Sequence, residues 1–462
     1  GGGERGEPHL PFIAVRHHSV GSSMRAAGCV GVTALSIALL AVAMGSAGYP
    51  LQRVLRRLYN VNMLFHEDNI VENFRSMHEL GFPHMMVSTR DAPIAPLEPL
   101  ADAAPLPSTF EWNGTTVNLS QWLQDKWTTG IVVIKRKSLT KAQLVYEHYG
   151  RGNDALSRCV SWSMCKSIVS TMFGIAVDRG IIGNIEKETV TDWVPELRGT
   201  GYDGVRLKDV LQMSSGVAFN EDYFHPFSDI NMMGYTLAFG GSMDSFVASL
   251  QREREPGTFN HYVSMDTQVL GMVLVRAANQ SLSAFLEEVL WSKVGFESSA
   301  IWSLDNEDSR MELAFGVLGV TTRDWARFGW LLLNEGLSPA SGERLLSKEW
   351  VAAATAPDAP HLMPGKANTQ SDYPSFGYGF QWWVAPRAED PSLPGRDFLA
   401  IGVYGQLIYI SPDDGIVVAK NGAYPFYASM QQAGSHENDL EIQGFHALRA
   451  IAKHYAAVGG AW

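Results

Sequence analysis

The stretch SWSMCKSIVSTMFGIAVDRG, residues 161–180, places a serine and a lysine three positions apart at the start of an apolar helix. Its apolar residues recur at helical spacing and the run ends at Gly180, so we expect a helix from about residue 163 to residue 179. On a helix, positions i and i+3 share a face, which brings the hydroxyl of Ser163 within reach of the amine of Lys166. The pair is either catalytic or a polar cap on a buried helix.

A serine hydroxyl is a weak nucleophile until a base takes its proton, and a lysine is that base where burial and neighbours lower its pKa. The Ser-x-x-Lys spacing alone is a weak signal, because Ser138 and Lys141 match it in a polar turn. Ser163 differs because it begins a long apolar helix, whose free amides favour a developing oxyanion. Cys165 lies on another face of this helix, and it and Cys159 are expected to be small core residues.

Two stretches further along the chain carry residues that would complete such a site. PGTFNHYVS, residues 256–264, offers Tyr262 as a proton carrier, and Ser264 points the same way if the stretch is extended. His261 then points away and is expected to be structural. AIGVYGQ, residues 400–406, is a strand interrupted by glycines, which indicates either a bulge or the close approach of another group to the backbone.

Composition and charge exclude several classes of function. The 462 residues carry 36 basic and 48 acidic side chains, a net charge of −12, which argues against a nucleic-acid partner. The three cysteines and 13 histidines show neither a zinc spacing nor an HExxH cluster, so we expect no metal and no other cofactor. Neither a G-x-S-x-G elbow nor a Walker loop is present.

Strand-like runs occur towards both ends of the sequence, and helices dominate between them. This order predicts an α+β fold in which one antiparallel sheet is built from two distant parts of the chain, with a cleft beside the helical region. The expected divisions are an N-terminal extension at 1–50, a connector at 51–104, an α/β domain at 105–160 and 321–462, and a mostly helical domain at 161–320.

The N-terminal region contains an apolar run, CVGVTALSIALLAVAMGSA at residues 29–47, of about the minimum length that spans a bilayer. We expect an exported or membrane-anchored protein, with the periplasmic side favoured. Gly45 and Ala47 offer a small-x-small cleavage site, so a signal peptide and a permanent anchor are both open. A buried core helix is the third alternative.

Ser163-x-x-Lys166, Tyr262-x-Ser264 and the glycine-bearing strand at Gly402 come in the order of the penicillin-recognising serine hydrolases, the class C β-lactamase-like superfamily. The chain resembles that superfamily over roughly residues 105–455. It is most similar to the 6-aminohexanoate-dimer hydrolases and family VIII carboxylesterases, through DVLQMSSGVAFNEDY, PGTFNHYVSMDTQVLG, TTRDWARFG, GYGFQWW and GVYGQLIYISP. The resemblance implies an antiparallel sheet flanked by helices, with an inserted, mostly helical region, as in β-lactamases and D,D-peptidases.

The resemblance also implies a role for each residue. Ser163 would be acylated, Lys166 would take its proton, and Tyr262 would carry protons to the leaving group and to the deacylating water. The oxyanion hole would be the backbone amides of Ser163 and Val403. The substrate contacts would be Tyr223, Ser264, Gly402 and Trp382 (or Trp383 beside it).

One motif departs from the β-lactamases and D,D-peptidases, whose third motif is Lys-Thr-Gly with a lysine that helps to bind the substrate carboxylate. The matching positions are Ala400-Ile401-Gly402, without charge or hydroxyl. This favours a small neutral substrate, an ester first and a short amide second. The alternatives are β-lactamase or D,D-peptidase activity, and a catalytically silent, membrane-anchored binding or sensor module.

Overall fold

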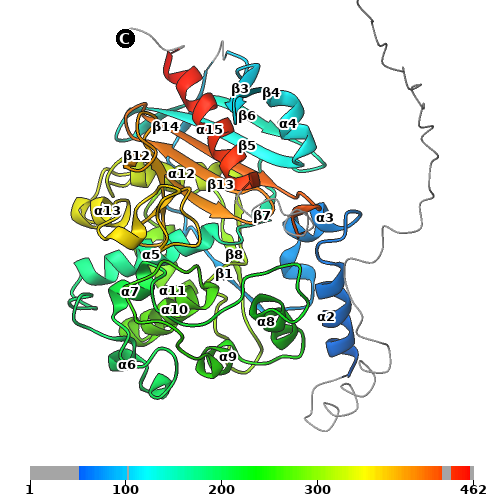
Figure 1. Ribbon diagram of the computed structural model, residues 1–462. Coiled ribbons are helices and arrows are strands. Elements are labelled where there is room, and N and C mark those ends of the chain that lie inside the picture. Colours follow the sequence, from blue (N-terminus) through cyan, green and yellow to red (C-terminus); the bar gives the residue numbers. More distant parts are fainter. Residues whose placement is uncertain (1–50, 101–103, 429–438, 458–462) are drawn as a thin grey trace, which may run out of the picture.

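The computed structural model describes residues 51–100, 104–428 and 439–457, and its centre is an eight-stranded sheet (Figure 1). The strands are antiparallel throughout, except that β2 runs parallel to β6 at one edge. In spatial order they are β10 (Gly377–Tyr378), β11 (Trp383–Pro386), β12 (Pro394–Gly402), β13 (Gln406–Ser411), β14 (Ile416–Gly422), β5 (Thr128–Ser138), β6 (Lys141–Tyr149) and β2 (Leu97–Pro99).

Helices cover both faces of this sheet. Gly329 of α12 (Thr322–Leu333) packs against Val417 and Ile408, whereas Gly444 of α15 (Asp439–Ala457) packs against Leu407, which points to the opposite face. Strands covered on both faces have no solvated side, and β13 and β14 are accordingly buried at every position. The predicted α+β fold, an antiparallel sheet flanked by helices, is confirmed.

A smaller sheet and a helical region lie beside the large sheet (Figure 1). The smaller sheet has the order β1 (His84–Val87), β8 (Ala300–Ser303), β9 (Leu318–Thr321) and β7 (Arg158–Val160). The helical region contains α5 (Met164–Asp178), α6 (Val190–Trp193), η2 (Pro195–Leu197), α7 (Leu207–Leu211), α8 (Asp229–Ala238), α9 (Met243–Ser249), α10 (Ser264–Ala278), α11 (Leu282–Leu286) and η3 (Glu287–Trp291). The remaining elements are β3 (Thr109–Trp112), β4 (Thr115–Asn118), α4 (Leu119–Asp125), α13 (Lys348–Ala354) and η4 (Pro360–Leu362).

Residues 51–104, which we expected to be a connector, contain regular structure as well as β1 and β2. The helices are α2 (Leu51–Met63), α3 (Ile70–Arg75) and η1 (Met77–Glu79). The Pro- and Ala-rich composition of residues 84–109 predicts an extended connector, whereas the structure places β1 and β2 within that range. Before it, Ile70 and Phe74 are buried in the main core, and Arg57 is buried with a 2.6 Å ion pair to Glu307. These contacts attach the segment to the folded body.

The predicted export or anchor segment at 29–47 lies outside the described residues. Within the described ranges, none of the single helices has the length and apolar composition needed to cross a membrane. Only α10 taken together with α11 and η3, bent by 75° between them, meets those criteria, and most of these residues are buried in the protein core. Over the same part of the chain, no group of three His, Cys, Asp or Glu side chains is arranged to hold a metal ion.

Candidate active site

The pair that opens α5 does not form a helix cap. Ser163 occupies the N-cap position, but its side chain makes no capping hydrogen bond. Its Oγ instead lies 2.9 Å from the Nζ of Lys166. The preceding residue, Trp162, has a left-handed backbone with φ of +40°, at the turn that leads from β7 into the helix. Ser163 therefore does not cap the helix, and its hydroxyl is paired with the buried lysine amine.

Lys166 is buried, with 2% of its surface exposed, and all its hydrogen bonds are made inside the protein. Besides Ser163, its Nζ donates to Ser264 Oγ at 3.1 Å and to the carbonyl of Phe315 at 2.9 Å. Burial lowers the pKa of Lys166 to about 8, against the opposing effect of the carboxylate of Glu221. The carbonyl can only accept, so a neutral Lys166 can keep donating there while its lone pair accepts the Ser163 proton.

Tyr262 completes the group around the nucleophile. Its hydroxyl hydrogen-bonds to Ser163, and its ring centroid lies 5.1 Å from Lys166 Nζ. Burial, with the charge of Glu221 in second place, raises the pKa of Tyr262 well above its usual value. The phenol therefore stays protonated, as a proton donor must. Trp383 stacks on it with a centroid distance of 5.5 Å.

The end of β12 brings a second backbone segment against the nucleophile. A Cβ added to Gly402 would lie 2.5 Å from the carbonyl oxygen of Ser161 and 3.1 Å from the amide nitrogen of Ser163. Position 402 therefore requires glycine because the backbone of residues 161–163 approaches it closely. Of the two alternatives that the sequence raised, a bulge or a close approach, the structure shows the close approach. Val403, the next residue, lines the same pocket as Ser163. This arrangement fits an oxyanion hole made by the two backbone amides.

These groups open into a pocket of about 60 Å³. Its walls combine two carboxylates, five aromatic rings and two aliphatic side chains around the serine. The lining residues are Ser163, Glu221, Tyr223, Tyr262, Tyr373, Trp383, Ile401, Val403, Tyr427 and Glu441. Tyr223 is in the pocket, as the resemblance implies.

Glu221 is the residue of this site that sequence reasoning missed. Its carboxylate accepts from the amide of Ser264 at 2.6 Å and from the hydroxyl of Tyr223 at 3.2 Å. Burial raises its pKa, and the nearby Lys166 opposes that rise. Its position two residues before Tyr223, in the quoted FNEDY, was the only signal available. Glu441 gave no signal, because α15 approaches the pocket from the far end of the chain.

Three predicted substrate contacts are not among the residues that line the pocket. Trp382 is 1% exposed and stacks on Phe328, so it belongs to the core. Successive residues point to opposite sides of an extended chain, which is why Trp383 faces the pocket instead. Ser264 begins α10 rather than continuing an extended stretch, and it contacts Lys166 and not the pocket. Gly402 packs against the backbone of Ser161 and Ser163 at the turn that carries the nucleophile.

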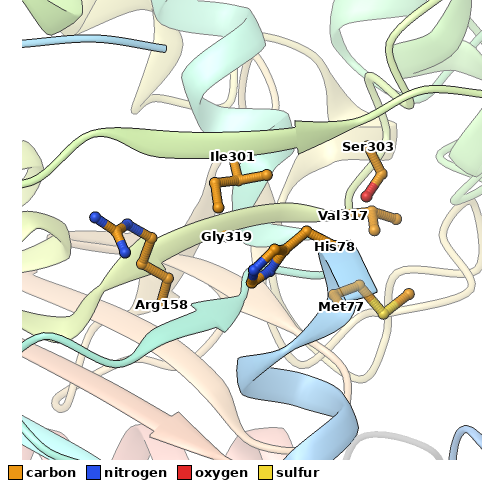
Figure 2. Close-up of a pocket in the computed structure, with 7 residues that line it drawn as sticks. All are labelled: Met77, His78, Arg158, Ile301, Ser303, Val317 and Gly319. Carbon is orange, nitrogen blue, oxygen red and sulfur yellow. The ribbon is translucent and has the colours of Figure 1, made fainter. Parts of the chain in front are cut away.

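Other candidate nucleophiles and cavities do not compete with this site. Cys159 and Cys165 are buried, and burial raises the pKa of both thiols, that of Cys159 to about 11. A second cavity, between η1 and the smaller sheet, has about 10 Å³, which is space for one water (Figure 2). Its walls carry no nucleophile paired with a base; they are Met77, His78, Arg158, Ile301, Ser303, Val317 and Gly319.

His261 has the structural role expected from the sequence. Its Nε2 contacts the carbonyl of Phe219 at 2.9 Å, and its Nδ1 contacts Asp372 at 2.5 Å. Both ring nitrogens are therefore engaged away from Ser163.

Comparison with known proteins agrees with the fold. Residues 131–429 match the Beta-lactamase family, and the chain belongs to this family of hydrolases. It is 28% identical over 359 residues to the 6-aminohexanoate-dimer hydrolase of Paenarthrobacter ureafaciens, covering 76% of this chain and 85% of the relative. The resemblance to the penicillin-recognising serine hydrolase superfamily is thereby confirmed.

Solved structures show the same fold. A Bacillus anthracis protein described as a candidate 6-aminohexanoate-dimer hydrolase superposes with a TM-score of 0.66 at 20% identity, covering 82% of this chain and 96% of that one. The penicillin binding protein of Bacillus halodurans superposes with a TM-score of 0.50 at 15% identity, covering 68% of this chain and all of that one.

Proposed function

We propose that the protein is a serine hydrolase that acts through an acyl-enzyme on Ser163. One observation carries the proposal: a buried amine with a pKa of about 8 lies 2.9 Å from the hydroxyl of a serine whose side chain does not cap the helix. A base with its pKa near the working pH takes the proton while it is still strong enough to activate the alcohol. A capping serine with a surface lysine would show neither feature.

In the acylation step, Ser163 Oγ attacks the substrate carbonyl carbon while its proton passes to Lys166. The carbonyl oxygen becomes an oxyanion between the amides of Ser163 and Val403. When the bond to the leaving alcohol or amine breaks, Tyr262 supplies the proton that this group takes, and Lys166 restores the phenol proton. Water then attacks the ester on Ser163, a proton returns through Tyr262 to the serine, and the carboxylic acid leaves.

The substrate we infer is a small ester or a short amide. The pocket has a volume of about 60 Å³, and its described lining residues include two carboxylates and no basic side chain. With Ala400 in place of the lysine of Lys-Thr-Gly, the site has less to offer a carboxylate beside the scissile bond than a β-lactamase has. The 6-aminohexanoate-dimer hydrolase relative supports the amide alternative.

Ser163→Ala tests the mechanism directly. Wild-type protein treated with a fluorophosphonate should gain one adduct, which peptide mass spectrometry assigns to Ser163. The variant should gain none, and its kcat for p-nitrophenyl butyrate should fall by at least about 10³-fold. Undiminished ester hydrolysis in the variant would refute the proposal.

Adduct formation on Ser163 and substrate turnover together separate the alternative functions. Turnover of the chromogenic cephalosporin nitrocefin at rates rivalling simple esters would favour β-lactamase or D,D-peptidase activity. A stable adduct on Ser163 without turnover of any ester, 6-aminohexanoate dimer or nitrocefin would favour a silent binding or sensor module.

A further inference from the structure

Four aromatic rings from three separate parts of the chain form one cluster beside the nucleophile. We call Phe65, Phe74, Trp162 and Tyr404 the aromatic clamp. Phe65 stacks on Tyr404 with centroids 4.5 Å apart and planes within 5°, and it contacts Trp162 at 5.6 Å. Phe74 meets Trp162 at 5.4 Å and Tyr404 at 5.6 Å, in edge-to-face geometry. The N-terminal segment thus contributes two rings and the two site segments one each.

The two rings from the site segments stand next to the two amides of the oxyanion hole. Trp162 directly precedes Ser163, and Tyr404 directly follows Val403. Both have left-handed backbones, with φ of +40° at Trp162 and +65° at Tyr404, which bulky residues rarely adopt. Such strain persists only where the surroundings over-determine it, and it gathers where it serves a site.

The segment that bears Phe65 and Phe74 is itself held firmly. The Nδ2 of Asn73 donates to the carbonyls of Met63 at 3.0 Å and Leu64 at 3.1 Å, which fixes the turn that presents Phe65. Phe74 is 2% exposed, and α3 contacts β7, the strand that leads to Ser163 (Figure 1). The Beta-lactamase family match begins at residue 131, so both rings come from outside it.

We propose that Phe65 is a positioning residue for the oxyanion hole. Its ring contacts Trp162 and Tyr404 together, so it ties the turn before Ser163 to the turn after Val403. This tie would hold the amides of Ser163 and Val403 on the same side of the pocket that both residues line. Phe65 is not among the residues that line the pocket, so it acts through its two ring partners. This inference rests on the proposed acyl-enzyme function.

Variants of Phe65 separate positioning from simple packing. Phe65→Ala should lower kcat for p-nitrophenyl butyrate by about 10- to 100-fold while KM changes by less than about threefold, because only transition-state contacts are lost. Phenylboronic acid forms a tetrahedral serine adduct with an oxygen in the hole, so its Ki should rise by the same factor as kcat/KM falls. Phe65→Tyr keeps the ring and should restore kcat to within about threefold of wild type.

Two controls give the stability and surface baselines. Phe296→Ala removes a ring that lies outside the site and stacks on Trp291 with a centroid distance of 4.0 Å. This variant should lose stability while kcat and Ki stay unchanged. Tyr59→Ala alters an exposed ring of α2 and should change nothing. Phe65→Leu is the second test variant. Leucine keeps an apolar side chain in this half-buried position but lacks the ring, so this variant tests the inference if Phe65→Ala does not fold.

If the folded Phe65→Ala and Phe65→Leu proteins both keep the kcat and the boronic acid affinity of the wild type, the inference is overturned and the proposed function is left intact. Absence of Ser163 acylation in the wild-type protein would overturn both.

Discussion

Glu221 and Lys166 set the base strength of the site together. Burial pushes the Lys166 amine towards its neutral form, and the Glu221 carboxylate pulls it back towards the ammonium. Only the neutral amine can take the Ser163 proton, so kcat/KM should rise with pH through the Lys166 pKa of about 8. We therefore expect the missed carboxylate to influence the pH at which the site works.

Glu221→Gln should move this rising limb to lower pH. A negative charge raises the pKa of a neighbouring amine, so its removal leaves burial as the main influence and lowers the Lys166 pKa. The amide keeps the size of the carboxyl group. The measurement is kcat/KM for a neutral p-nitrophenyl ester between pH 6 and 10, with Glu288→Gln on the exposed face of η3 as the control. An unmoved limb, or one moved to higher pH, would show that Glu221 does not act on the base.

At the scale of elements, the contact between the end of β12 and the start of α5 decides the geometry of the site. Gly402→Ala adds a methyl group 2.5 Å from the Ser161 carbonyl oxygen, which neither backbone can accommodate without moving. We expect kcat to fall by about 10- to 100-fold with a smaller change in KM, because a shift of about 1 Å misplaces the Val403 amide.

Gly234→Ala is the matched control for this substitution. Gly234 lies in α8, and a Cβ there meets nothing within 4 Å. Alanine also has the higher helix propensity, so this variant should be as stable as wild type or more so, with the same kcat. Equal kcat values for Gly402→Ala and wild type would show that β12 does not position the oxyanion hole.

Strand β14 carries a buried amine that should make stability depend on pH. Lys420 is 1% exposed, and burial lowers its pKa to about 7 from the ordinary 10.5. Between these values the unfolded chain binds the proton and the folded protein does not, so stability rises with pH across this window. The contribution is up to about 1.4 kcal/mol per pH unit for one proton.

Lys420→Met should remove that part of the pH dependence. Urea unfolding of both proteins at pH 7.5, 8.5 and 9.5 measures it, because Lys166 and the other groups contribute equally to each and cancel in the difference. The gap between wild type and Lys420→Met should change in favour of the wild type as the pH rises. A constant gap would mean that Lys420 is charged in the folded protein at pH 7.5.

Elements with local signals were predictable from the sequence. The helix expected from about residue 163 to residue 179 spans residues 164–178. The turn conformations at Trp162 and Tyr404, in contrast, are left-handed at residues that disfavour them, and tertiary ring contacts hold them there. The backbone propensities of single residues do not predict such positions. The choice between Trp382 and Trp383 depended on strand parity, which shifts with a one-residue change in where β11 begins.

The whole molecule places its chemistry where distant parts of the chain meet. The described pocket walls include the start of α5, the loop of Glu221 and Tyr223, Tyr262 just ahead of α10, the strands β11 and β12, and α15 at the other end of the chain. Order along the sequence identified Ser163, Lys166 and Tyr262, because each falls within a short motif. It had no means of placing Glu441, since only the complete fold brings α15 to the nucleophile.

Glu221 and Glu441 together should give the pocket a preference for substrate charge. A carboxylate on the acyl chain would approach two like charges at low dielectric, whereas an ammonium would be attracted. We expect kcat/KM to be about tenfold lower for the mono-p-nitrophenyl ester of adipic acid than for p-nitrophenyl hexanoate, and highest for p-nitrophenyl 6-aminohexanoate. Glu441→Gln should reduce the differences in kcat/KM among the three esters. About 0.5 M salt should reduce them further, because salt screens charges that are exposed to solvent. Faster turnover of the adipate ester would instead indicate a cation that binds carboxylates, as the Lys-Thr-Gly lysine does in β-lactamases.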